Sequence, residues 1–180
     1  MNLINALTRA IDEPDVFISQ STTRDLAWPG ITGYLASSLS FFVFFGLSGF
    51  IPFRFFSFFA IAFFIIAGNF FSLSMIHLFL ESTGANGNAV KLFLFSGIIG
   101  FFHTILVPLG IMTKISYFGI FLSIIAVTTA ALFFKIWTIR RLYNASRSKA
   151  FWAISAPYLV FSAAFFIFTA FATAWFLWVI

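Results

Sequence analysis

This chain of 180 residues lacks cysteine and has few charged residues, with only five acids. The absence of cysteine excludes disulfides, thiolate metal sites and cysteine nucleophiles. Charged residues make up 8% of the chain, whereas a soluble domain carries about 25%. Since 62% of the residues are hydrophobic, a water-soluble surface cannot be built and lipid must be the main solvent.

Long apolar runs separated by charges or turn residues predict an all-α fold, a polytopic transmembrane helix bundle with five spans. Each run has about 20 apolar residues, the length needed to cross a hydrocarbon core about 30 Å thick. The last run is longer, so its first turn before Pro157 is expected in the interface or in a tilted helix. The predicted spans are residues 30–51, 55–80, 92–112, 115–134 and 151–180, within a membrane domain of residues 29–180.

The distribution of lysine and arginine predicts the orientation, because these residues accumulate in cytoplasmic loops. Eight fall on one side of the predicted spans and two on the other, which places the N-terminus in the cytoplasm and the C-terminus outside. In a prokaryote this would be the cytoplasmic (inner) membrane. Tryptophans at the predicted span ends agree with this topology. The first side holds Arg9, Arg24, Lys91, Lys135, Arg140, Arg141, Arg147 and Lys149, and the second holds Arg54 and Lys114.

Residues 1–28 are predicted to be a cytoplasmic segment that contains an interfacial amphipathic helix. Leu3, Ile4, Leu7 and Ile11 recur at helical spacing before Pro14, which would end the helix. A frayed tail is the alternative. The segment has acids and no apolar core, so a cleaved signal peptide is not expected.

The predicted loop over residues 135–149 is the most basic stretch of the chain. Its positive charge fits the positive-inside rule and would also attract anionic lipid. The alternative is a docking surface for an acidic partner. Because the positive residues cluster at loops, nucleic acid is not a predicted partner. The candidate interaction residues here are Arg140, Arg141, Arg147 and Lys149.

The predicted spans contain no Asp, Glu, Lys or Arg, which argues against a pump or an ion-coupled carrier. Their notable polar residues are Asn69, His77 and His103. The two histidines would differ in depth by about 12 Å, too much for one haem iron held within one subunit. His103 is instead expected to bond a backbone carbonyl or a hydroxyl in the bundle. No catalytic, metal-binding or cofactor-binding residue is predicted.

Gly46-Leu47-Ser48-Gly49 in the first span is similar to the serine motif of intramembrane rhomboid proteases. Ser48 lies near the outer surface whereas His103 lies near the midplane, so a serine–histidine pair is not expected. The small residues are better explained by close helix contact, as are Gly33, Ser37 and Ser40 in the same span and Ala170 and Ala174 in the last.

Four short motifs lie within or beside the predicted spans. They are Asp25-Leu26-Ala27-Trp28-Pro29, His77-Leu78 with the turn 84–88, Pro108, and Ile136-Trp137 through Leu142 followed by Ser146 and Ala150. Together they resemble the Yip domain family, five-span membrane proteins whose eukaryotic members interact with Ypt/Rab GTPases. The first motif is similar to the family's Asp-Leu-x-Gly-Pro motif, with Trp28 in place of glycine, and the others resemble features of prokaryotic members. The resemblance implies a prokaryotic-type member with the same fold and topology. It also marks Asp25 and Pro29 as candidate interaction residues, although a helix cap at Asp25 with Pro29 in the first turn is the structural interpretation.

The sequence favours a non-enzymatic membrane protein that acts as a scaffold, a partner-binding protein or an accessory subunit. The expected partners are the lipid bilayer and another membrane protein or complex, or a second copy of the chain. A transporter, pore or lipid-handling protein for apolar solutes is the alternative. A redox subunit that holds a cofactor through His77 and His103 is a weaker one.

Overall fold

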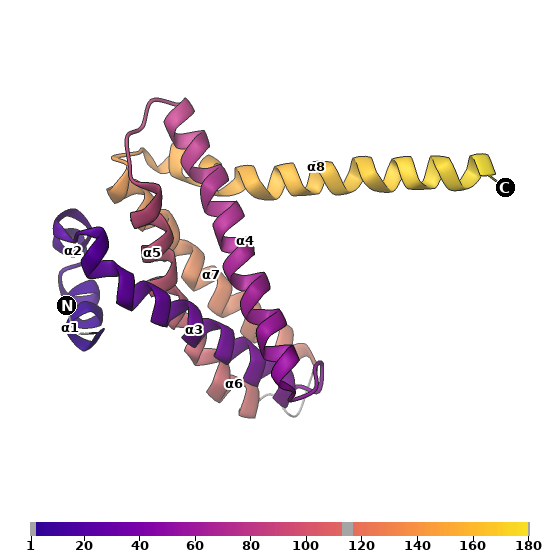
Figure 1. Cartoon of the computed structure of the whole chain (residues 1–180), viewed down its shortest axis with the longest axis horizontal. Helices are drawn as coiled ribbons and strands as arrows, with labels where there is room; N and C mark the ends of the chain where they lie inside the picture. The colour runs from indigo at the N-terminus through magenta and orange to yellow at the C-terminus, as the bar shows by residue number, and fades with distance from the viewer. Residues whose placement is uncertain (1–2, 113–116, 180) are drawn as a thin grey trace.

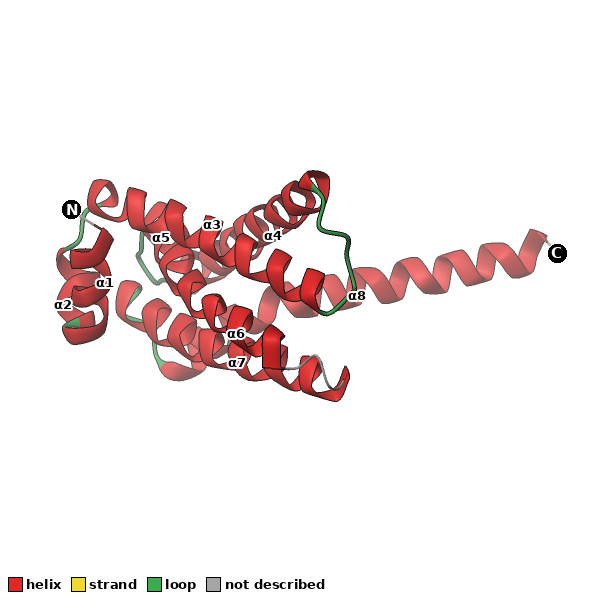
Figure 2. Cartoon of the chain, turned by 90° about the horizontal axis from the view of Figure 1, so that it is seen from below, coloured by secondary structure: helices red, strands yellow, loops and turns green. Residues whose placement is uncertain are grey.

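The computed structural model describes residues 3–112 and 117–179, and all secondary structure in these ranges is helical (Figures 1 and 2). Among the described residues, five helices are long and apolar enough to cross a membrane, which supports the predicted integral membrane protein. The predicted start of the fourth span and Lys114 lie outside the described residues. The elements are α1 (Leu3–Asp12), α2 (Pro14–Gln20), α3 (Thr23–Leu47), α4 (Phe55–Ser82), α5 (Ala89–Ile99), η1 (Gly100–Ile105), α6 (Leu106–Met112), α7 (Tyr117–Leu142) and α8 (Arg147–Val179).

The third span is not one continuous α-helix, because a 3₁₀ segment, η1, separates α5 from α6. Pro108 lies in the first turn of α6. Its backbone nitrogen has no hydrogen to donate. In a regular α-helix its ring would also collide with the carbonyl of Thr104, four residues earlier. The tighter 3₁₀ turns over Gly100–Ile105 take up this conflict.

The closest contact between helices is the crossing of α3 and α5, where two glycines face each other. A Cβ atom on Gly33 would overlap the backbone carbonyl of Gly97, and one on Gly97 would overlap the carbonyl of Gly30. Ser37, one turn further along α3, lies against Gly100. The prediction that small residues of the first span allow close helix contact is therefore confirmed for Gly33 and Ser37.

One end of the molecule, which we call the basic end, comprises α1, α2, the starts of α3, α5 and α8, and the ends of α4 and α7. Asp15 of α2 forms an ion pair with Arg141 of α7 at 2.8 Å. Lys149 of α8 donates to the carbonyl of Thr83, just after α4, at 2.9 Å. These contacts bring together the segments that the sequence assigns to one side of the membrane. That this side faces the cytoplasm remains the prediction from lysine and arginine.

Helices α1 and α2 form a hairpin that packs its apolar side on the basic end (Figure 1). Pro14 begins α2 at its first turn, where its missing N–H costs little. Phe17 and Ile18 are buried with Leu26, and the Phe17 ring meets Phe95 of α5 edge to face. Helix α1 covers the stretch where the N-terminal helix is predicted, and the side chains of Leu3, Leu7 and Ile11 lie outside the described ones.

Helix α8 departs from the bundle. Its first turns bury Ala150, Ala153 and Ile154 in a core shared with α4, α5 and α7, so the part before Pro157 packs on the bundle. From Tyr158 to Trp175 every side chain is exposed, and both views show this part projecting beyond the other helices (Figures 1 and 2). Only 11% of its apolar stretch is buried, against 44% in the span formed by α5, η1 and α6.

Candidate functional site

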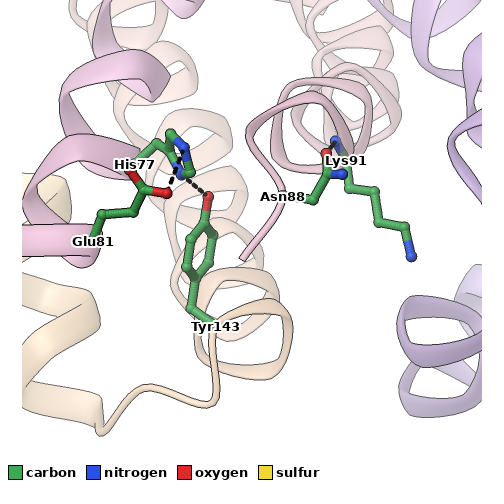
Figure 3. Close-up of polar contacts among 5 residues, drawn as sticks. All are labelled: His77, Glu81, Asn88, Lys91 and Tyr143. Atoms are coloured by element: carbon green, nitrogen blue, oxygen red, sulfur yellow. Dashed lines mark hydrogen bonds and ion pairs between the residues drawn. The ribbon is translucent and has the colours of Figure 1, made fainter. Parts of the chain in front are cut away.

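At the basic end, His77 of α4 lies between a carboxylate and a hydroxyl. Its Nδ1 is 2.8 Å from the hydroxyl oxygen of Tyr143, and its Nε2 is 3.4 Å from Oε1 of Glu81, one turn further along α4. Figure 3 shows the imidazole pointing toward Tyr143 and Glu81, with Tyr143 reaching it from the end of α7. Tyr143, buried at 2% exposure, therefore links two spans that are far apart in the sequence.

The turn after α4 encloses the ring of Tyr143. Gly84 has a φ of 81°, which favours glycine, and a Cβ on Gly87 would overlap the Tyr143 ring. Asn144, the residue directly after Tyr143, has a φ of 48°, a conformation that asparagine tolerates better than most residues. Asn88 then caps α5 by accepting a hydrogen bond from the Lys91 N–H at 2.9 Å (Figure 3).

The electrostatics keep Tyr143 protonated. Burial, together with the nearby charge of Glu81, raises the pKa of Tyr143 to about 12. The neutral phenol shares one hydrogen with Nδ1 of His77, and Nε2 of the same ring lies beside the Glu81 carboxylate. This chain of Tyr143, His77 and Glu81 acts as a polar clamp between α4 and the end of α7.

A second polar cluster lies within the spans and corrects the expectation that they carry no charge. Lys135 was assigned to the loop, but it lies inside α7, which continues as a helix to Leu142. Its ammonium group donates to the Asn69 side-chain oxygen of α4 at 3.1 Å. The Ser96 hydroxyl of α5 donates to the same oxygen at 3.2 Å. Asn69 thus joins α4, α5 and α7.

Lys135 precedes the end of α7 by about 10 Å at 1.5 Å per residue, so it lies deeper than a loop residue. In the sequence, mostly apolar residues continue past Lys135 up to Ile139. This run is the signal by which the predicted fourth span could have been extended beyond residue 134. A charged side chain at this depth is costly unless it is paired or reaches water, and such residues are often functional. Within the described chain, Lys135 contacts no carboxylate.

His103 bonds a hydroxyl and a backbone carbonyl, as expected. Its Nδ1 lies 3.0 Å from the Ser37 hydroxyl and 3.1 Å from the carbonyl oxygen of Gly100. Ser48 instead donates to the Phe44 carbonyl at 2.8 Å. The two histidines therefore belong to separate clusters, and Ser48 does not pair with His103.

The helix cap near Asp25 differs in detail from the prediction. Thr22 is the N-cap residue of α3, and Asp25 is the third helical residue of a reciprocal capping box. The Asp25 carboxylate accepts from the Thr22 N–H at 3.1 Å and from its hydroxyl at 2.6 Å. Pro29 lies inside α3 beyond the first turn, because the helix begins at Thr23 and not near residue 30. Thr32 donates to the carbonyls of Trp28 and Pro29 beside it.

The basic candidates are spread over the basic end and do not form one cluster. Arg141 pairs with Asp15, whereas Lys149 bonds the Thr83 carbonyl. Arg140 is partly buried, and its Nε has no hydrogen-bond partner within the described ranges. Arg147 is exposed at the start of α8. In the portion of the chain that the structure covers, no three His, Asp or Glu side chains gather as they would around a metal ion.

Comparison with known proteins found no matching family model, no matching curated protein and no matching solved structure. The resemblance to the Yip domain family therefore stays a prediction. Sequence reasoning named His77, His103 and Asn69 but missed Tyr143 and Ser96, and it named Ser37 only as a small contact residue. The residues of each pair come from different spans, and their rotation about the helix axes is not encoded locally.

Proposed function

We propose that this integral membrane protein is a non-enzymatic scaffold that binds through α8, and that its first partner is a second copy of the chain. The observation that supports this is the exposure of every side chain from Tyr158 to Trp175. The rest of the described chain packs without this part of α8, so no contact among the described residues determines what lies beside it.

Helix α8 has two different sides. The side that packs on the bundle with Ala153 and Pro157 continues at helical spacing as Phe161, Phe168 and Phe171. The opposite side carries pairs of small residues seven positions apart, with Leu159 and Phe166 between successive pairs. The pairs are Ser155–Ala156, Ser162–Ala163 and Thr169–Ala170. In lipid, helices associate where small residues let backbones approach, and a seven-residue repeat keeps such a surface in register along two helices.

A second copy fits this surface because small-residue pairing works best when both helices contribute the same kind of side chain. Copies inserted with the same topology present their α8 helices in parallel, which gives a closed two-fold interface. A symmetric pair would leave both basic ends on the same side of the membrane, available to further partners.

The test is the oligomeric state of the full-length protein in lipid nanodiscs, measured by native mass spectrometry. We expect dimers for the natural chain and mainly monomers for a variant with Ala163→Leu and Ala170→Leu. A matched control, Ala164→Leu with Phe171→Leu, changes the other side of α8 and should remain dimeric. Monomers of the natural chain would refute the self-association, and a partner that co-purifies and is lost only in the first variant would replace the second copy with another membrane protein.

Transport is the second candidate function, favoured by Lys135 inside the bundle. Under this alternative, Lys135 and Asn69 would line a path for an anionic or lipid-like solute. Purified protein in liposomes would then carry out a solute flux or lipid scrambling that Lys135→Gln abolishes. An absence of flux for a panel of anions and labelled lipids favours the scaffold.

A further inference from the structure

Two cavities lie between the α1–α2 hairpin and the start of α3, at the basic end. They have volumes of about 440 and 300 Å³, and Arg9 and Asp25 line both. Asn5 and Thr8 complete the wall of the larger cavity, while the smaller one is lined by Glu13, Gln20 and Ser21 among others. The cavities therefore combine a guanidinium, two carboxylates and neutral polar groups.

The charged groups around these cavities are largely unused by the fold. The Arg9 guanidinium and the Glu13 carboxylate form no hydrogen bond or ion pair with any other residue that the structure describes. Asp25 uses one oxygen, Oδ2, for both of its bonds to Thr22. The Asp25 side chain lines both cavities, and its other oxygen, Oδ1, takes no part in these two bonds.

The cavities lie at the level expected for lipid headgroups. Trp28 follows Asp25 by about one turn of α3 and is 63% exposed, as is typical of a tryptophan at the membrane–water interface. The α1–α2 hairpin covers the end of the bundle with its apolar side, so its polar residues face the headgroup layer. A headgroup can therefore enter the cavities while its acyl chains stay beside α3.

The charges select the kind of headgroup. Arginine presents a planar fork of donors that suits a phosphate, and carboxylates suit a primary ammonium group. Arg9, Glu13 and Asp25 together carry a net charge of −1, which disfavours an anionic headgroup. A choline group has no N–H to donate. We propose that these cavities bind a phosphoethanolamine group, with its phosphate on Arg9 and its ammonium on Glu13 and Asp25.

The experiment is native mass spectrometry of the delipidated full-length protein mixed with equimolar phosphatidylethanolamine, phosphatidylcholine and phosphatidylglycerol. We expect preferential retention of phosphatidylethanolamine, reduced roughly tenfold by Arg9→Gln and by Glu13→Gln, since each removes a charge-assisted contact. Neither side chain supports the fold, so both variants should fold normally. Arg24→Gln, which makes the same charge change on a residue outside the cavities, should keep the preference.

Three results would overturn the proposal: equal retention of the three lipids, stronger retention of phosphatidylglycerol, or a preference unchanged by Arg9→Gln and Glu13→Gln. Competition with soluble glycerophosphoethanolamine identifies the source of the group. Displacement of the lipid means that the headgroup alone is recognised. Failure to displace it, with the variant effects intact, means that the whole lipid is required. Neither arm depends on α8, so the result is independent of the proposed self-association.

Discussion

The bundle of α3 to α7 and the projecting part of α8 are both apolar helices, yet they are used differently. In the bundle, glycine at the crossing of α3 and α5 brings backbones into contact, and polar side chains such as Asn69 and Tyr143 join one span to another. Beyond Pro157, the side-chain hydrogen bonds made by the described residues of α8 stay within the helix, from the Thr169 and Thr173 hydroxyls to backbone carbonyls.

This difference shows that hydrophobicity alone brings a helix into lipid but does not choose its neighbour. In lipid, partner choice comes from close backbone packing and from the few polar groups, because apolar side chains gain no hydrophobic free energy by leaving lipid for protein. The bundle has both within the chain. On the side of α8 that is turned from its own bundle, small residues alternate with Leu159 and Phe166.

The largest effect is expected where α3 and α5 touch. Gly33→Leu or Gly97→Leu would force the two backbones apart, because even a Cβ overlaps the opposite carbonyl. We expect a loss of folded, monodisperse protein in detergent, corresponding to about 3 kcal/mol or more. The readout is size-exclusion chromatography with thermal melting.

Gly68→Leu is the matched control, since Gly68 of α4 has open space where its Cβ would be. It should leave the melting temperature unchanged or slightly raised, because leucine has the higher helix propensity. Equal damage from Gly68→Leu and Gly33→Leu would mean that the crossing is not the critical contact.

The next effect compares two phenylalanines. Phe44 is fully buried beside Leu106 and Ile120, so Phe44→Ala should lower the free energy of unfolding by about 3–5 kcal/mol. Phe171 is 70% exposed on α8, and Phe171→Ala should change it by less than about 0.5 kcal/mol. Chemical denaturation in mixed micelles gives both values. A large loss from Phe171→Ala would indicate that α8 folds back onto the bundle.

A smaller effect is expected at the polar clamp. Tyr143→Phe keeps the buried ring but removes the hydroxyl that bonds His77, which should cost about 1–2 kcal/mol. The raised pKa of about 12 adds a pH test, because a group that holds its proton more tightly when folded loses its contribution as pH rises from 10 through 12. The Tyr143→Phe variant should therefore lose less stability than the natural chain over this range. Parallel losses would show that Tyr143 does not titrate as described.

The smallest effect is expected at the ion pair between Arg141 and Asp15. Both side chains are more than half exposed, and such pairs contribute at most about 1 kcal/mol. Arg141→Gln should shift the melting temperature only slightly, and the shift should vanish at high salt. The α1–α2 hairpin should stay docked through Phe17, as limited proteolysis would show. Release of the hairpin by Arg141→Gln would show that the ion pair, and not the apolar contact of Phe17, holds the hairpin on the bundle.

Much of the fold could be predicted from the sequence, because length and apolarity determine whether a helix crosses a membrane. The five long apolar helices follow from those features alone. Two features could not be predicted: the 3₁₀ break before Pro108 and the continuation of α7 beyond Lys135. A transmembrane helix accommodates a proline in several ways, and a lysine near the end of a span can belong to the helix or to the loop.

The polar sites were only half predictable. Asn69, His77 and His103 stood out because polar residues are rare in apolar runs. Their partners depend on how each helix is rotated about its axis, which is set by contacts such as Gly33 with Gly97. The aromatic and small sides of α8 are readable from spacing, but only the structure shows which side meets the bundle.

The most direct test of the role of α8 is disulfide cross-linking in native membranes, for which the absence of cysteine removes any background. Single cysteines would be placed at Ala163 and Ala170 on the small-residue side, and at Ala164 and Phe171 on the other. We predict that oxidation produces covalent dimers from Ala163→Cys and Ala170→Cys but not from Ala164→Cys or Phe171→Cys. Equal cross-linking at all four positions, or none at Ala163 and Ala170, would contradict the assignment of α8 as the helix through which the chain assembles.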